Sequence, residues 1–221
     1  MKLFLDTAHL ADLKIAADWG ILEGVTTNPS LAAKEGLEFP DLVKAITDLV
    51  PGPVSAEVTA ESVEEMVVQG KELASIAKNV VIKVPLTREG ISAGSRLVAA
   101  DIPINATLVF SPAQAILAAR IGATFVSPFL GRVDDIGNSG LELLRQIVEI
   151  YMVQGYETEV LAASLRSPQH VVDSAQIGAD IATMPFGVMD KLFNHPLTDI
   201  GMDRFNADWE AYQQALAEKR S

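Results

Sequence analysis

The chain alternates eight times along its length between short apolar runs and stretches with helical spacing. The apolar runs, often rich in β-branched residues, are the expected strands at residues 3–5, 24–26, 54–58, 80–84, 102–109, 124–126, 159–163 and 181–184. Between most of them, apolar residues recur at intervals of three and four, as in amphipathic helices. Continuously apolar strands joined by helices are typical of a parallel sheet covered on both faces. Eight such units in 221 residues predict a compact (β/α)8 barrel.

Helix boundary signals support this division of the chain. The clearest helical stretch is 62–77, where Ser62 and Glu65 have the spacing of a capping box. A doubly wound open sheet is the alternative, but the sequence lacks a G-x-G-x-x-G motif after the first strand and lacks a G-x-x-x-x-G-K-[ST] phosphate loop. Since no linker or low-complexity segment divides the chain, we expect one domain over residues 1–221, with a C-terminal helical extension from about residue 200.

Charge and composition exclude several classes of function. Lys and Arg number 17 against 29 Asp and Glu, so the net charge of −12 argues against binding to nucleic acid or to anionic membranes. The chain has no cysteine, which excludes disulfides, zinc–thiolate sites, iron–sulfur clusters and a thiol nucleophile. Its three histidines, His9, His170 and His195, are scattered along the sequence. These counts leave little room for a histidine-based metal site.

Neither of two apolar segments fits a targeting or membrane signal. The N-terminal run reaches Asp6 too early for the core of a signal peptide. The uncharged run 102–119 contains Pro103, Asn105, Pro112 and Gln114, so a buried strand followed by a helix fits it better than a membrane span. The expectation is a soluble cytoplasmic protein.

Polar side chains stand at the ends of nearly all the expected strands or just after them. In a barrel, the C-terminal strand ends and the loops that follow them build the active site. The eighth strand ends in Met184-Pro185-Phe186 and offers no ionisable group. The candidates from the other seven are Asp6, Thr26, Asn28, Glu57, Lys83, Asn105, Thr107, Ser127, Arg132, Ser164 and Arg166.

Lys83 is the most informative of these residues because it lies inside an apolar strand. Burial disfavours the charged ammonium and favours the free amine, which attacks carbonyl groups to form a Schiff base. A solvated surface lysine is the alternative. Asp6 and Glu57 could be a general acid/base pair around an iminium, or either could form a structural ion pair with Lys83 or an arginine. Arg132 and Arg166 could clamp a phosphate, or each could be a solvated arginine.

Four sequence blocks then carry a family resemblance. They are Gly24-Val25-Thr26-Thr27-Asn28-Pro29-Ser30, Val81-Ile82-Lys83-Val84-Pro85, Ser127-Pro128-Phe129-Leu130-Gly131-Arg132 and Leu161-Ala162-Ala163-Ser164-Leu165-Arg166. In this order, they make the chain resemble the transaldolase family, in particular its small single-domain branch that also contains fructose-6-phosphate aldolases. The resemblance covers essentially the whole chain. It implies a TIM barrel that moves a dihydroxyacetone unit between sugar phosphates and that requires neither a metal nor an organic cofactor.

The resemblance also implies roles for individual residues. Lys83 resembles the Schiff-base lysine, and Asp6 the acid/base that takes the C4 hydroxyl proton as the C3–C4 bond breaks. Glu57 and Thr107 resemble the pair that holds a catalytic water. The positions that match substrate-binding ones are Thr26, Asn28, Asn105, Ser127, Phe129, Ser164 and, for the phosphate, Arg132 and Arg166. The small branch also tends to form pentamers and decamers in which the C-terminal helix reaches a neighbouring subunit, so we expect a homo-oligomer.

Two positions distinguish transfer from simple aldol cleavage within the branch. Fructose-6-phosphate aldolases tend to carry Gln and Tyr where this chain has Glu57 and Phe129. The resemblance thus favours a transaldolase of the pentose phosphate pathway, which converts sedoheptulose 7-phosphate and glyceraldehyde 3-phosphate to erythrose 4-phosphate and fructose 6-phosphate. One alternative is an aldolase that releases free dihydroxyacetone. The other is a non-catalytic sugar-phosphate-binding barrel.

Overall fold

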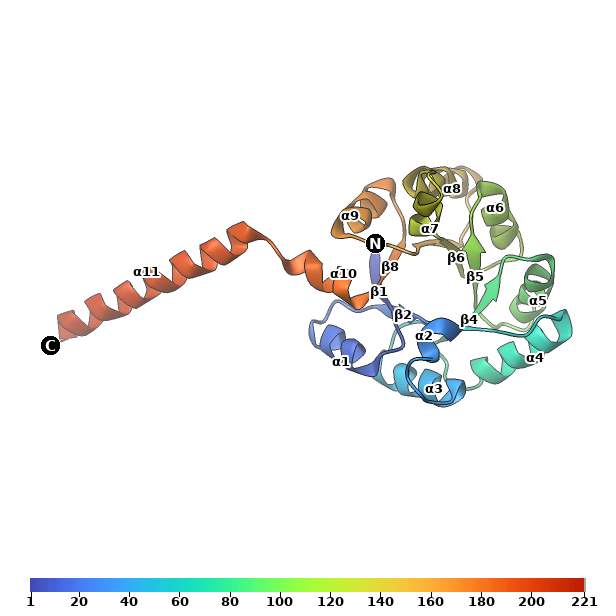
Figure 1. Cartoon of the computed structure of the whole chain (residues 1–221), viewed down its shortest axis with the longest axis horizontal. Coiled ribbons are helices and arrows are strands. Elements are labelled where there is room, and N and C mark those ends of the chain that lie inside the picture. Colours follow the sequence, from blue (N-terminus) through green and yellow to red (C-terminus); the bar gives the residue numbers. More distant parts are fainter. Residues whose placement is uncertain (221) are drawn as a thin grey trace. The chain divides into compact units, whose positions relative to one another are not determined.

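The computed structural model, which describes residues 1–220, contains a closed barrel of eight parallel strands in sequence order. The last strand pairs with the first, so the sheet has no free edge. Figure 1 shows the strands as an inner ring with helices around it. The (β/α)8 barrel is therefore confirmed and the open doubly wound sheet is excluded. The strands are β1 Lys2–Asp6, β2 Gly24–Thr26, β3 Val54–Glu57, β4 Val80–Pro85, β5 Ile104–Val109, β6 Phe125–Pro128, β7 Glu159–Ala162 and β8 Ile181–Met184.

The helices follow the boundary signals in the sequence. Ser62 caps the helix Val63–Ala74 by accepting a hydrogen bond from the Glu65 amide, and its hydroxyl donates to the Glu65 carboxylate. Pro112 and Pro168 are the first residues of two further helices, where a missing N–H costs nothing. The helices are α1 Leu10–Asp18, α2 Pro29–Ala32, α3 Phe39–Leu49, α4 Val63–Ala74, α5 Arg88–Val98, α6 Pro112–Arg120, α7 Leu130–Asp135, α8 Gly140–Gln154, α9 Pro168–Ile177, α10 Phe186–Asp190, the 3-10 turn η1 Lys191–Phe193, and α11 Pro196–Arg220.

The chain forms two compact units. The barrel is the unit Met1–Met189, and a second unit begins at Asp190 and includes α11. The expected C-terminal helix is present and begins at Pro196, somewhat earlier than residue 200. None of the helices within residues 1–220 combines the length and apolar character needed to cross a membrane.

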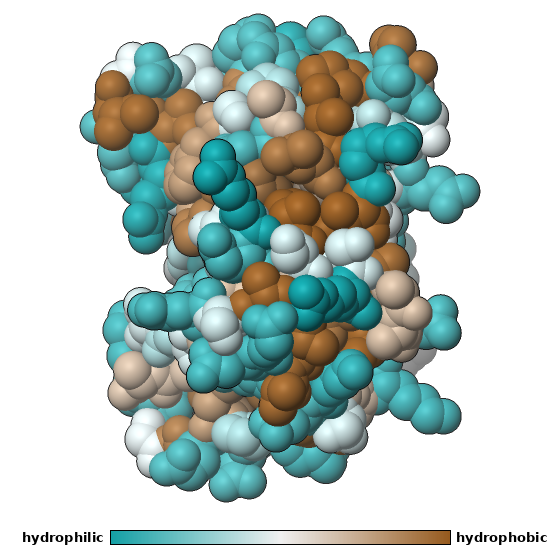
Figure 2. Space-filling model, turned by 90° about the vertical axis from the view of Figure 1, so that its right-hand side faces the viewer, coloured by the Kyte–Doolittle hydropathy of each residue, from teal (hydrophilic) through white to brown (hydrophobic). Residues whose placement is uncertain are grey.

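The outside and the inside of the barrel differ in their side chains. Figure 2 shows the side on which α4 and α5 lie, where hydrophobic and hydrophilic residues are intermixed at the surface. The interior instead has an apolar layer across its width, formed by Phe4, Val81, Phe125, Leu161, Ala163 and Ile181. Side chains alternate along a strand, so residues two positions further along face the same interior. Asp6, Lys83 and Ser127 occupy such positions and place polar groups beyond the apolar layer.

The apolar layer depends on one glycine. Phe4 is fully buried and its ring meets the Phe125 ring edge to face, with the centroids 6.2 Å apart. Gly24, on the neighbouring strand β2, lies directly against it, and a Cβ atom there would be 2.4 Å from Phe4 Cζ. Only glycine leaves room for the Phe4 ring at this point.

We predict that Gly24→Ala lowers the free energy of unfolding by about 1–3 kcal/mol, the usual effect of overpacking a filled core. Gly187→Ala is the matched control, because a Cβ at Gly187 in α10 meets no atom within 4 Å. Chemical denaturation of both variants measures the difference. Equal midpoints would show that the Phe4 ring moves aside without cost.

Candidate active site

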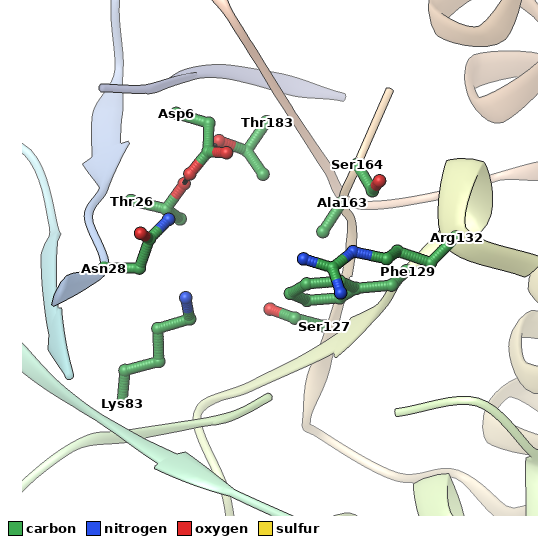
Figure 3. Close-up of a pocket in the computed structure, with 10 residues that line it drawn as sticks. All are labelled: Asp6, Thr26, Asn28, Lys83, Ser127, Phe129, Arg132, Ala163, Ser164 and Thr183. Carbon is green, nitrogen blue, oxygen red and sulfur yellow. Dashed lines mark hydrogen bonds between the residues drawn. The ribbon is translucent and has the colours of Figure 1, made fainter. Parts of the chain in front are cut away.

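A cavity of about 130 Å³ opens at the C-terminal ends of the strands. In Figure 3, Lys83 points into it, with Asp6, Thr26 and Thr183 on one side and Arg132 with Phe129 on another. A second hollow of about 420 Å³ shares four lining residues with this cavity, and it adds Glu57 and Thr107. The shared residues are Asn28, Lys83, Phe129 and Arg132. Most of the predicted site residues therefore come from distant parts of the chain into one connected space.

Lys83 is buried, with 4% of its surface exposed. Its Nζ donates hydrogen bonds to Glu57 Oε2 at 2.9 Å and to the Thr27 carbonyl oxygen at 3.2 Å. The pairing with Glu57 follows from strand register, since Glu57 on β3 lies opposite Lys83 on β4. The amine thus has the ion pair considered from the sequence, and it also faces the cavity. A carboxylate in contact with Nζ can accept a proton from it and return one.

Asp6 lies at the end of β1, at the edge of the same cavity. Burial raises the pKa of Asp6 above its ordinary value, and the positive charge of Lys83 and the hydrogen bond from Thr26 act in the opposite direction. Thr26 Oγ1 donates to Asp6 Oδ1 at 2.8 Å. A carboxyl group whose pKa moves toward neutrality exchanges protons more readily at physiological pH.

Thr107 is fully buried, and its hydroxyl has no hydrogen-bond partner among the described residues. It lines the second hollow together with Glu57. The next residue, Leu108, has a positive φ of 58°, and the β5–β6 register shifts between Ala106 and Val109. Such strain in a non-glycine residue and such bulges occur preferentially at functional sites. Between Ala106 and Val109, no glycine or other turn residue predicts this bulge.

A buried hydrogen-bonded chain supports the wall formed by β6. Ser127 Oγ donates to Asn105 Oδ1 at 2.7 Å, and Asn105 Nδ2 donates to Ser55 Oγ at 3.1 Å. Ser127 lines the cavity, whereas Asn105 is not among its lining residues and holds Ser127 from behind. Ser55 was not predicted, although its position two residues before Glu57 in an apolar strand was an available signal.

The two candidate phosphate-binding arginines lie in different surroundings. Arg132 lines both hollows, and Ser164, with a positive φ of 60°, lines the first. Arg166 lines neither of them; its guanidinium is about half exposed and donates to both oxygens of Asp135. The structure therefore brings Arg132 and Ser164 to the cavity and leaves Arg166 outside its lining.

Sequence reasoning also missed a residue on β8. Thr183 is 1% exposed, lines the cavity, and has its Oγ1 2.7 Å from Thr26 Oγ1. The eighth strand ends without an ionisable group, which is why no site residue was predicted there. The usable signal was a threonine within an otherwise apolar run, as at Thr107.

Within residues 1–220, no cluster of three or more His, Asp or Glu side chains is arranged to hold a metal ion. The groups around the cavity are instead an amine, two carboxyl groups, hydroxyls, amides and a guanidinium. Such a set can form a covalent bond to a carbonyl carbon and move protons around it.

Comparison with known proteins agrees with this chemistry. The family model described as "Transaldolase/Fructose-6-phosphate aldolase" matches residues 3–220. Proteins named "Probable transaldolase" from Hydrogenobaculum sp. (strain Y04AAS1), Petrotoga mobilis and Methanococcus maripaludis are 54%, 50% and 56% identical. The matches cover 95%, 100% and 97% of this chain and 97%, 100% and 100% of theirs. The resemblance carried by the four sequence blocks is thus confirmed.

A solved structure shares the fold alone. The thiamine phosphate pyrophosphorylase from Pyrococcus furiosus matches with a TM-score of 0.58 at 17% identity, over 83% of this chain and 85% of that one. Identity at this level supports the barrel architecture and no shared activity.

The Thr107 hydroxyl, which has no hydrogen-bond partner among the described residues, leads to a prediction about stability. Thr107→Val removes a buried hydroxyl that makes no hydrogen bond, so we expect stability to stay unchanged or to rise by up to about 1–3 kcal/mol. Thr27→Val is the matched control, because the fully buried Thr27 hydroxyl donates to the Ser55 carbonyl oxygen at 2.9 Å. Thr27→Val should lower the free energy of unfolding by about 1 kcal/mol. Equal losses in denaturant titrations would show that Thr107 is hydrogen-bonded in the folded protein.

Proposed function

Because the chain belongs to the transaldolase/fructose-6-phosphate aldolase family, we propose that it is a transaldolase that transfers a dihydroxyacetone unit through a Schiff base on Lys83. The observation that carries the proposal is a buried amine that faces a cavity and contacts a carboxylate, Glu57, at 2.9 Å. The proposed reaction converts sedoheptulose 7-phosphate and glyceraldehyde 3-phosphate to erythrose 4-phosphate and fructose 6-phosphate. It is a step of the pentose phosphate pathway.

The first stage of the proposed mechanism forms the Schiff base. Glu57 takes a proton from Lys83, and the free amine attacks the C2 carbonyl carbon of the ketose phosphate. Loss of water from the resulting carbinolamine gives an iminium ion. Glu57 and Thr107 line the same hollow, and the free Thr107 hydroxyl supports a role in holding that water. The same pair returns water to the iminium when the product is released.

The second stage breaks and remakes a carbon–carbon bond. Asp6 accepts the C4 hydroxyl proton while the C3–C4 electron pair moves into the iminium, which becomes an enamine. The aldose phosphate leaves, and the enamine carbon then adds to the aldehyde carbon of the acceptor as Asp6 gives back its proton. The raised pKa of Asp6 supports this exchange in both directions.

Substrate phosphate needs local attraction, since the chain carries a net charge of −12. Arg132 supplies it in this proposal, because its guanidinium lines both hollows. Arg166 joins the phosphate only after its guanidinium leaves Asp135. Asn28, Ser127 and Ser164 line the cavity and hold the hydroxyls of the dihydroxyacetone unit.

The choice of transfer over release rests on Phe129. The centre of the Phe129 ring is 5.9 Å from Lys83 Nζ. The ring therefore lies beside the position that the substrate carbon chain takes when it is attached to that nitrogen. A transferase must keep the enamine from being protonated until an acceptor arrives. Phe129 has no hydroxyl with which to orient a protonating water, which supports transaldolase over the aldolase that releases free dihydroxyacetone.

The C-terminal helix supports the expected homo-oligomer. Large apolar side chains on α11 are exposed in the single chain: Leu197, Ile200, Met202, Phe205, Trp209 and Tyr212. Apolar residues that stay exposed in this number commonly mark an interaction surface. We propose that another copy of the chain covers them.

Borohydride trapping tests the Schiff base. Incubation with fructose 6-phosphate followed by reduction should add a dihydroxyacetone or sugar-derived mass to the peptide that contains Lys83. Lys83→Met should abolish both the adduct and transfer to erythrose 4-phosphate, whereas Lys78→Met, at an exposed lysine, should leave both unchanged. An unmodified Lys83 would overturn the mechanism and favour the non-catalytic barrel.

Phe129→Tyr tests the transfer assignment. We expect free dihydroxyacetone release to rise relative to transfer by about tenfold or more, because a placed proton donor contributes about 10²–10⁴ to such steps. Phe110→Tyr is the matched control, because the Phe110 and Phe129 ring centroids are 5.9 Å apart but Phe110 does not line the cavity. If the ratio of release to transfer is the same in both variants and the parent, Phe129 does not control the outcome.

A further inference from the structure

We propose that Thr183 is a positioning residue for the proposed reaction, because its hydroxyl holds Thr26 in the orientation that donates to Asp6. The proposal rests on the proposed function and deepens it. The observation is a continuous chain of three groups from neighbouring strands of the barrel. Thr183 Oγ1 on β8 is 2.7 Å from Thr26 Oγ1 on β2, and Thr26 Oγ1 is 2.8 Å from Asp6 Oδ1 on β1. Dashed lines mark both contacts in Figure 3.

The direction of these hydrogen bonds follows from counting protons. An ionised carboxylate only accepts, so the single hydroxyl proton of Thr26 must point to Asp6. Thr26 then has no proton left for Thr183, and Thr183 must donate to Thr26. Thr183 and Thr26 are 1% and 2% exposed, so bulk water does not compete for these positions. Thr183 thus occupies the Thr26 lone pair and leaves the Thr26 proton for Asp6.

This arrangement leaves the two oxygens of Asp6 in different states. Oδ1 accepts from Thr26, and no described side chain is hydrogen-bonded to Oδ2. Oδ2 is therefore the oxygen available to accept a substrate hydroxyl proton. A hydroxyl that itself accepts a hydrogen bond becomes a stronger donor. Thr183 therefore strengthens the hydrogen bond from Thr26 to Asp6 Oδ1 without contacting Asp6 itself.

Three charged side chains besides Asp6 line the cavity or the adjoining hollow within the described residues. Lys83 from β4 and Arg132 from α7 line the same cavity, and Glu57 from β3 lines the adjoining hollow. Thr26 and Thr183 are uncharged, so their replacement by valine changes no charge near Asp6. A shift in the pH profile of such a variant then reports the lost hydrogen bonds.

The test is a double-mutant cycle on the full chain, with Thr26→Val, Thr183→Val and the pair. We expect Thr183→Val to lower kcat about two- to tenfold with KM nearly unchanged, which is the range for one net hydrogen bond. The acidic limb of the kcat/KM profile should move to higher pH, because the carboxylate loses stabilisation. Thr183→Ser should restore both. In the Thr26→Val background, the second substitution should have no further effect, because Thr183 acts only through Thr26.

Several results would overturn the proposal. An additive effect of Thr183→Val in the Thr26→Val background, or a rise in KM, would mean that Thr183 contacts the substrate itself. An unchanged pH profile and kcat would mean that it only fills space. If Thr183→Val does not fold, Thr183→Ala enters the same cycle in its place.

A separate readout keeps this test distinct from the proposed function. Trapping of the Lys83 adduct does not require the bond-breaking step in which Asp6 takes part, so Thr183→Val should form the adduct like the parent. If the parent itself gives no adduct, the proposed function has failed. If every variant gives the adduct and Thr183→Val reacts like the parent, only the role of Thr183 has failed.

Discussion

Moving an ammonium group out of water costs several kcal/mol unless an opposite charge and hydrogen bonds replace the lost solvent. Lys83 is buried inside the barrel, where its Nζ donates hydrogen bonds to Glu57 and to the Thr27 carbonyl oxygen. The contact with Glu57 depends on strand register, which places Glu57 opposite Lys83. Asp6 feels the same positive charge, which opposes the effect of its burial. The pKa of Asp6 is thus linked to this buried pair through the charge of Lys83.

An apolar core inside the barrel accompanies the polar groups of the site. Phe4 is fully buried in it, Gly24 leaves room for the Phe4 ring because it has no side chain, and Phe125 meets that ring from another strand. Asp6, Lys83 and Ser127 follow Phe4, Val81 and Phe125 by two residues on the same strands, and all three line the cavity. The same three strands therefore contribute both to the apolar core and to the site.

The barrel was predictable from the sequence, because alternating strand and helix signals determine the fold class. Most of the candidate site residues line the two hollows, because polar residues near the ends of apolar strands lie at the C-terminal rim of a barrel, as Lys83 and Asp6 do. The sequence did not predict Thr183, because a hydroxyl in a strand is a weaker signal than a charge. The bulge at Leu108 was missed, since no turn residue marks it. The ion pair between Arg166 and Asp135 depends on where α7 lies after β6. The local sequence around Arg166 does not show how close Asp135 comes to it.

The apolar cluster formed by Phe4, Val81, Phe125, Leu161, Ala163 and Ile181 lies inside the barrel, and the cavity that contains Lys83 opens at the C-terminal ends of the strands. Molecules that use this cavity to reach Lys83 therefore enter and leave on that side of the barrel. In the proposed transfer, the departing aldose phosphate and the arriving acceptor both use this side of the barrel. Because the two would occupy the same space in turn, the first product would leave before the acceptor binds, and a high concentration of either aldehyde would compete with the other.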